Sequence, residues 1–182
     1  MKLLILFFAI VLSSPGAVIS VSPSSQSVTL GNQVTLDVAI TGAQDVYAFQ
    51  FDIAFDPAIL EALSVSQGTL LAGSGGFVPG TIDNGAGTVG FTIDSLIGPI
   101  PGINADGTLG QLLLSTLAAG VSPITLSNVI LLDSNLADIP FTLEDGTVTV
   151  TSSTAAVPEP ASWTLLAAGA AAVYLTSRRR SA

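Results

Sequence analysis

The chain of 182 residues contains 13 acidic and four basic residues, which give a net charge of −9 at neutral pH, and it has neither His nor Cys. The lack of Cys excludes disulfide bonds and thiolate chemistry from this chain, and the lack of His removes the commonest general base and zinc ligand. The basic residues lie only at the two ends, so residues 21–157 carry acidic charge alone. Because nucleic acids are bound largely through Lys and Arg, we expect no nucleic-acid partner.

Residues 1–20 have the pattern of a secretory signal peptide. Lys2 precedes the uncharged run Leu3–Leu12, and small residues with a proline follow. This run of ten residues is too short to span a bilayer core, which needs about 20 residues. Cleavage after Ala17 would place a proline at the −3 position, and cleavage after Ser20 would place a valine there, so the sequence leaves both sites open. We therefore expect an exported protein.

Residues 21–150 are predicted to form one all-β domain, because apolar and polar residues alternate with the two-residue period of half-buried strands. The alternation is clearest over Val34–Ile40, Tyr47–Phe55 and Val89–Ile93, and Gly, Asn and Asp mark turns between such segments. Many short strands with this spacing predict a β-sandwich. The apolar pattern within Ile124–Leu131 changes phase, which indicates a β-bulge.

The same alternation assigns aromatic side chains to the core or to the surface. Phe51 is central in its strand and is predicted to be buried, with Gln50 and Asp52 facing the other way. The other phenylalanines that fit the buried face are Phe49, Phe55 and Phe91. Phe77, in a glycine-rich loop, is the best candidate for an exposed contact, and Phe141 is a second. This short supply of exposed aromatic rings argues against a module that binds sugars by stacking.

The domain resembles the cohesin family. The match runs in order through Phe55-Asp56-Pro57, Ile59-Leu60-Glu61, Asp106-Gly107-Thr108-Leu109, Leu131-Leu132-Asp133 and Gly146-Thr147-Val148-Thr149-Val150. The resemblance implies a cohesin-like jelly-roll β-sandwich of about nine strands over residues 21–150. It also implies a non-catalytic module that binds carbohydrate or protein. Cohesins bind dockerins through one sheet face, but the chain offers no dockerin-specific residues to carry over.

Two other functions remain open: a purely structural matrix component and, less favoured, a polysaccharide hydrolase. A glycosidase needs a pair of carboxylates. The available acidic residues are Asp56, Glu61, Asp94 and Glu144. Acidic residues at strand ends and turns more often hydrogen-bond the backbone of their own turn. We therefore assign no catalytic residue and expect no enzyme.

Acidic loops raise the possibility of calcium, which prefers carboxylate, amide and carbonyl oxygens. The weak candidate ligands are Asp83, Asn104, Asp106, Asp133 and Asp138. None of these loops has the spacing of an EF-hand. The favoured interpretation is that these side chains stabilise turns, so we predict neither a metal site nor a cofactor.

The C-terminal segment has three parts in a fixed order. A Ser/Thr-rich spacer at 151–156 leads to a proline-flanked acid, an apolar run at 161–177 predicted to be a transmembrane helix, and a final cluster of arginines. The residues that define this pattern are Pro158, Glu159, Pro160, Arg178, Arg179 and Arg180. Positive charge beside an apolar run marks the cytoplasmic side of a membrane segment.

This arrangement, over residues 157–182, resembles the PEP-CTERM sorting signal. The resemblance implies that an exosortase-type membrane protease recognises the signal and removes the helix. The precursor would be anchored in the membrane through its C-terminal helix, and the processed protein would reach the cell envelope or the extracellular space. Because such systems accompany exopolysaccharide production, the resemblance also implies a surface or biofilm-matrix protein whose partner is a polysaccharide or a surface protein.

Overall fold

The computed structural model describes residues 16–152 and Gly169. The chain divides into two units, Met1–Ser152 and Ser153–Ala182, and the fold described below is that of the first. Within residues 16–152 the strands are β1 (Ala17–Ser22), β2 (Ser25–Thr29), β3 (Gln33–Thr41), β4 (Ala48–Ala54), β5 (Leu60–Gln67), β6 (Thr81–Asp83), β7 (Thr88–Ser95), β8 (Gly107–Thr116), β9 (Gly120–Leu132), β10 (Phe141–Glu144) and β11 (Gly146–Thr151).

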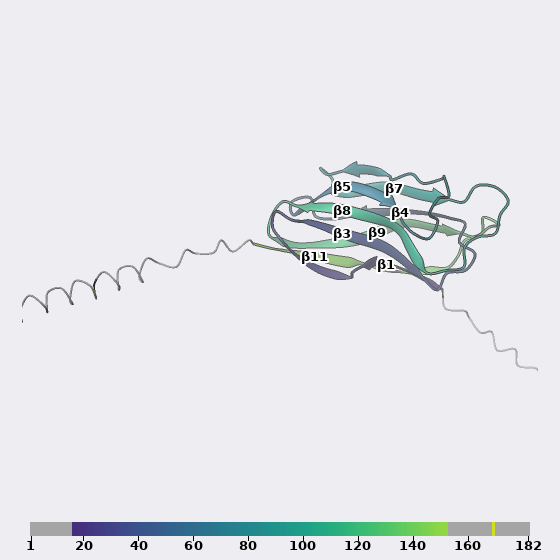
Figure 1. Ribbon diagram of the computed structural model, residues 1–182, viewed down its shortest axis with the longest axis horizontal. Coiled ribbons are helices and arrows are strands. Elements are labelled where there is room, and N and C mark those ends of the chain that lie inside the picture. The colour runs from purple at the N-terminus through teal and green to yellow at the C-terminus, as the bar shows by residue number, and fades with distance from the viewer. Residues whose placement is uncertain (1–15, 153–168, 170–182) are drawn as a thin grey trace, which may run out of the picture. The chain divides into compact units, whose positions relative to one another are not determined.

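The strands form two sheets that face each other as the two layers of a sandwich (Figure 1). The five-stranded sheet has the order β10-β1-β3-β8-β5, and the six-stranded sheet has the order β2-β11-β9-β4-β7-β6. Neighbouring strands are antiparallel except for the outer pairs β1–β10 and β2–β11, which are parallel. The prediction of an all-β sandwich is therefore confirmed.

The structure has eleven strands where the resemblance implied about nine, because two chain segments each contribute one strand to both sheets. β1 lies in the five-stranded sheet and β2, just beyond Pro23, lies in the six-stranded sheet. β10 and β11, separated by Asp145, are divided between the sheets in the same way. Counting each pair as one segment turns the eleven strands into nine segments. These crossing segments join the two layers along one side of the sandwich.

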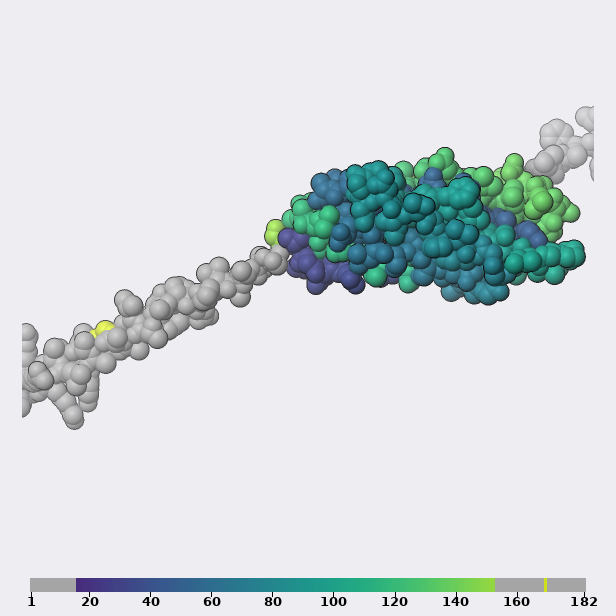
Figure 2. All heavy atoms as spheres, turned by 90° about the horizontal axis from the view of Figure 1, so that it is seen from above, coloured from purple at the N-terminus to yellow at the C-terminus, as the bar shows by residue number. Residues whose placement is uncertain are grey.

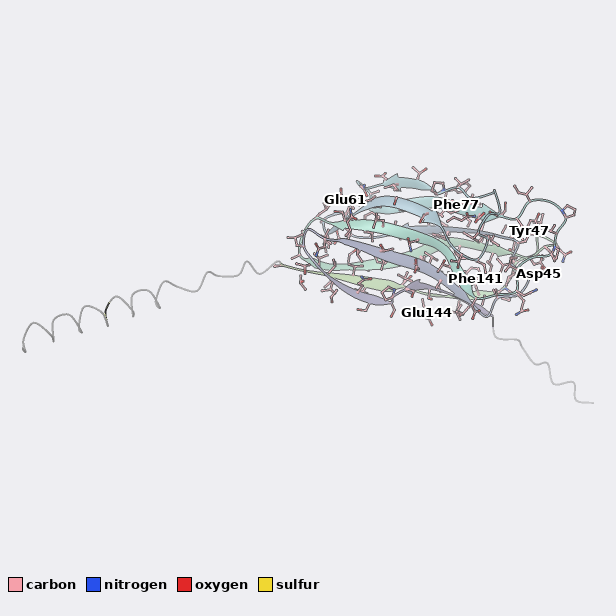
Figure 3. The ribbon with its side chains drawn as sticks, viewed as in Figure 1. Asp45, Tyr47, Glu61, Phe77, Phe141 and Glu144 are labelled. Carbon is pink, nitrogen blue, oxygen red and sulfur yellow. The ribbon has the colours of Figure 1, made fainter. Side chains whose placement is uncertain are left out.

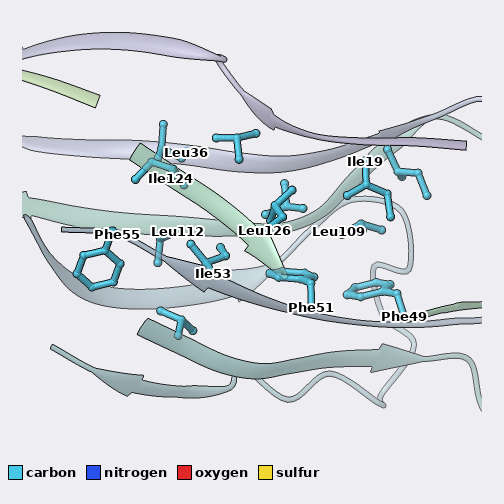
Figure 4. Close-up of a cluster of buried hydrophobic side chains, with 14 of the residues drawn as sticks. Ile19, Leu36, Phe49, Phe51, Ile53, Phe55, Leu109, Leu112, Ile124 and Leu126 are labelled. Atoms are coloured by element: carbon cyan, nitrogen blue, oxygen red, sulfur yellow. The ribbon is translucent and has the colours of Figure 1, made fainter. Parts of the chain in front are cut away.

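The core lies between the sheets and is built from the alternating apolar residues. Phe51 is completely buried at the centre of β4, and its ring stacks on that of Phe49 with the centroids 5.9 Å apart (Figure 4). Phe55 is buried beyond the end of the same strand. The predicted burial of these three rings is confirmed. Burying a large aromatic side chain removes on the order of 150–250 Å² from water, which makes β4 a major source of stability.

One open edge between the layers is closed by a side chain instead of a strand. Asn84, in the turn after β6, accepts a hydrogen bond from the backbone N–H of Ala62 at 2.7 Å and donates to its carbonyl oxygen at 3.0 Å. The amide thus occupies backbone groups of the edge strand β5 that would otherwise be free to pair with another chain. Seen from this edge, the blue and teal atoms of the β5–β7 region form a continuous surface (Figure 2).

The first strand begins earlier than the predicted domain start at residue 21. β1 begins at Ala17, and both Ala17 and Ile19 belong to the core. At the other end of the chain, the sorting residues Pro158–Pro160 and Arg178–Arg180 lie outside the described residues, as does the helix predicted at 161–177 apart from Gly169. Among the residues described, no helix has the length and apolar character needed to cross a membrane.

Candidate functional site

Strand β7 contains a bulge that turns an aromatic ring out of the core. Gly90 and Phe91 together oppose the single residue Asp52 of β4, and Phe91 has a left-handed backbone with φ of 64°. After the extra residue the inward positions fall on Thr92 and Asp94, which are completely buried. Phe91 is therefore 59% exposed, and its predicted place in the core is wrong because one inserted residue reverses every later side-chain direction.

A second bulge lies on the other side of β4, in β9. Asn128 and Val129 together oppose Phe51, and Asn128 also has a left-handed backbone, with φ of 48°. The phase change predicted for this strand is confirmed. Beyond the bulge Leu131 points into the core, and Ile130 points outward with 44% of its surface exposed.

Asp52 connects the two bulges through its carboxylate. Its Oδ1 accepts a hydrogen bond from the backbone N–H of Phe91 at 2.6 Å, and its Oδ2 accepts one from Asn128 Nδ2 at 2.6 Å. Gln50 Nε2, two residues earlier on β4, donates to the Asn128 carbonyl oxygen at 3.3 Å. Hydrogen bonds to an ionised acceptor are about twice as strong as neutral ones. Asp52 therefore holds both left-handed residues, each of which costs on the order of 1–3 kcal/mol if unsupported.

We define the Phe91 face by Gln50, Asp52, Phe91, Asn128 and Ile130, on the outer side of the six-stranded sheet. Since β4 pairs with β7 on one side and with β9 on the other, the two exposed apolar side chains flank a polar central strand. Aromatic residues surrounded by satisfied polar groups are typical of protein interfaces. Each bulge is held by a hydrogen bond to Asp52, and a surface that is ordered before binding loses less entropy on association.

The aromatic contacts predicted from the sequence lie elsewhere. Phe77 and Phe141 are both partly buried, and Phe141 packs against the core (Figure 3). Phe77 is thus exposed only in part, and Phe91, with 59% of its surface exposed, is the aromatic residue most open to a partner among these three. The available signal for Phe91 was the glycine that precedes it, because a glycine inside a strand pattern often marks a bulge.

Most of the candidate calcium ligands hydrogen-bond to backbone N–H groups. Asp83 Oδ1 accepts bonds from Gly85 and Ala86, and Asp133 Oδ1 accepts bonds from Asn135 and Ala137, all between 2.8 and 3.0 Å. Asp106 accepts the N–H of Gly42, Asn104 accepts that of Asp45, and Asp138 forms a backbone bridge with Leu132. Within residues 16–152 no group of three or more acidic side chains is placed to hold a metal ion.

Asp45 has a structural role that the sequence reasoning missed. Its Oδ1 accepts the backbone N–H of Gly102 at 2.7 Å, and its Oδ2 accepts the hydroxyl of Ser134 at 2.7 Å. The carboxylate thus ties together three loops at one end of the sandwich (Figure 3). The hydrogen bond from Ser134, followed by that from Gly102, lowers the pKa of Asp45 below its ordinary value of 3.8.

The four acidic residues considered for hydrolysis lie on different elements of the fold. Glu61 lies on β5 and Glu144 on β10, at opposite edges of the five-stranded sheet (Figure 3). Asp94 is buried and accepts hydrogen bonds from Gln67 Nε2 at 2.8 Å and Ser74 Oγ at 2.5 Å. Asp56 caps its own turn by accepting the N–H of Ala58. Asp56 thus serves a turn, and Asp94 serves loop packing.

The two-layer architecture and its sheet order define a cohesin-type module, the fold of a non-catalytic binding domain. The family model described as Cohesin domain matches residues 19–150, and the chain belongs to that family. A second family model, PEP-CTERM protein-sorting motif, matches residues 156–180. This motif indicates an exported precursor, anchored in the membrane and sorted to the cell envelope or the extracellular space. A search of curated proteins finds no match.

Several solved structures share the fold. A non-cellulosomal cohesin from the archaeon Archaeoglobus fulgidus has 19% identity and a TM-score of 0.62, over 76% of this chain and 94% of that one. A type I cohesin–dockerin complex from Clostridium thermocellum contains a chain with 14% identity and a TM-score of 0.67, over 80% and 99%. The solution structure of CaCohA2 from Clostridium acetobutylicum has 24% identity and a TM-score of 0.63, over 77% of this chain and 94% of that one.

Proposed function

We propose that this protein is a non-catalytic surface or matrix module that binds a protein partner through the Phe91 face. The observation that carries the proposal is Phe91 itself, an aromatic side chain held outward by a bulge that Asp52 stabilises. Keeping a bulky residue in a left-handed conformation costs stability, and such strain tends to persist where function requires it. The solved cohesin–dockerin complexes support a protein partner by analogy of fold.

The chemistry of the face favours protein over polysaccharide. Phe91 and Ile130 offer two apolar contacts on either side of β4, and the Asp52 carboxylate is already engaged by protein donors. The residues described contain 12 acidic and no basic side chains. Complementary charge accelerates association and is screened by salt, so we expect a partner with a basic surface and an association rate that falls as salt is added.

Retention of the mature protein on its own cells tests the proposal. We expect Phe91→Ser to reduce retention at least tenfold, and Leu143→Ser, which changes an exposed apolar residue on β10, to leave it unchanged. Treating the acceptor cells with protease should abolish retention of the wild type, and degrading their polysaccharide should not. Equal retention of both variants and the wild type would favour the purely structural alternative, and protease-resistant retention would favour polysaccharide.

We also propose that an exosortase-type membrane protease recognises the sorting signal. The family match over residues 156–180 covers Pro158–Pro160 and Arg178–Arg180, the elements of the predicted signal. We expect Glu159→Ala to leave the precursor uncut in the membrane, and Thr154→Ala, in the spacer, to be processed normally. Mass spectrometry of the C-terminus reads the result. A wild-type surface protein that still carries its three arginines would indicate a permanent anchor instead.

A further inference from the structure

The first strand of the sandwich places a limit on where the signal peptide is removed. β1 runs over Ala17–Ser22, and its inward residues Ala17, Ile19 and Val21 are at most 3% exposed. The backbone N–H of Ala17 donates a hydrogen bond of 3.0 Å to the carbonyl oxygen of Pro140. Residues Ala17–Ser22 therefore belong to the folded domain, although the signal-peptide pattern in the sequence extends to Ser20.

Strand β10 depends on the first four residues of β1 for all of its pairing. Its four residues Phe141–Glu144 pair in parallel with Ala17–Ser20, and β10 has no other neighbour in its sheet. On the other side of β1, residues 18–20 pair with residues 39–41 of β3. Cleavage after Ser20 would therefore remove the buried Ile19, leave β10 without a partner and expose the backbone of β3.

Cleavage after Ala17 is less damaging but still removes part of the strand. It would delete a buried methyl group and the hydrogen bond to Pro140. The next bond toward the N-terminus, between Gly16 and Ala17, leaves β1 complete. It also has Gly16 at the −1 position and Ser14 at the −3 position, the small residues that signal peptidase sites require.

We infer that the signal peptide is cleaved between Gly16 and Ala17, so that the mature protein begins with Ala17 at the first position of β1. The reaction is hydrolysis: water adds across the amide, Gly16 leaves with a carboxylate, and Ala17 gains an α-ammonium group. That ammonium keeps the donor that bonds to Pro140, and its charge strengthens the bond. The inference rests on the signal peptide proposed from residues 1–20, independently of any partner.

Two variants of the full chain distinguish the competing bonds. Ser14→Lys places a charge at the −3 position of the Gly16–Ala17 bond, and Val18→Lys places one at the −3 position of the Ser20–Val21 bond. Val18 is a half-buried outward residue of β1, where a lysine stem can lie along the surface. The measurement is the intact mass and N-terminal sequence of the exported protein, together with the amount of uncut precursor in the membrane.

We expect the wild-type protein to begin at Ala17. Ser14→Lys should raise the amount of uncut precursor in the membrane at least tenfold over the wild type. Val18→Lys should be processed at the same bond as the wild type. A mature N-terminus at any other residue, Val18 and Val21 above all, would overturn the assignment. So would a block of processing by Val18→Lys. A wild-type protein that keeps Met1–Gly16 would overturn both the assignment and the signal peptide itself.

Discussion

Strands β4 and β7 are neighbours with the same alternating pattern in the sequence, yet only one of them follows it throughout. In β4 the apolar residues Phe49, Phe51 and Ile53 all point into the core. In β7 the pattern holds at Val89 and reverses at the bulge, which places Phe91 in solvent. Alternation thus reports the face of a residue only while the pairing stays in register.

The two strands differ because β7 has a carboxylate on its neighbouring strand that can stabilise an extra residue. Opposite Gly90 and Phe91 of β7, Asp52 of β4 offers a carboxylate that accepts a hydrogen bond from the N–H of Phe91 and stabilises the extra residue. The opposing bulge in β9 uses the other oxygen of the same carboxylate. A single polar residue on the regular strand therefore shapes the irregular strands on both sides. Stability resides on the inner face of β4, and the recognition we propose resides on its outer face.

Phe51→Ala tests the inner face and should have the largest effect. Removing a completely buried ring from the centre of the core should lower the free energy of unfolding by about 3–5 kcal/mol. Phe91→Ala, which removes a ring that is 59% exposed, should change it much less. Urea denaturation of both variants reads the difference. The reverse order would mean that the register of β4 against β7 is wrong.

Asp52→Ala tests the link between the strands. Loss of two charge-assisted hydrogen bonds at left-handed residues should cost about 1–3 kcal/mol. Asp37→Ala is the matched control, because Asp37 lies on the outer face of the other sheet and accepts one bond from Gln111. We expect the control to cost less than about 1 kcal/mol. Equal losses in the two variants would show that Asp52 does not hold the bulges.

Replacing Phe91 by glycine or by alanine tests the bulge, because the bulge determines which of the two variants is the more stable. At a regular strand position glycine is less stable than alanine by about 0.5–1 kcal/mol. At the left-handed φ of Phe91 we expect the order to reverse, with glycine more stable by about 0.5–1 kcal/mol. The Thr35→Gly and Thr35→Ala pair, on the exposed face of β3, should show the ordinary order. An ordinary order at position 91 would contradict the bulge.

The smallest expected effect is the pH dependence of the stability that Asp45 contributes by joining three loops. Because the folded protein lowers the pKa of Asp45, its contribution to stability is complete above the ordinary value of 3.8 and is lost as the pH falls through the lower folded value. Thermal melts of the wild type and Asp45→Asn should therefore differ most above pH 4 and converge in stronger acid. A constant difference at every pH would mean that the charge of Asp45 is not involved.

The sequence predicts the parts of this molecule that local pattern determines. The sandwich, the burial of Phe51 and the bulge in β9 follow from spacing along a single segment. Phe91 and Asp45 escape prediction because each depends on a contact across the fold, with Asp52 in one case and with Ser134 and Gly102 in the other. β1 was missed in part because its small and apolar residues also fit the end of a signal peptide.

Photo-cross-linking from position 91 in the full chain, on cells, tests Phe91 as the contact residue most directly. A benzophenone amino acid in place of Phe91 keeps an aromatic side chain on the outer face, and the same group in place of Leu143 provides the control on the other sheet. We predict a discrete, protease-sensitive adduct from position 91 and none from position 143. The absence of an adduct at position 91, or equal labelling from both positions, would contradict recognition through this face.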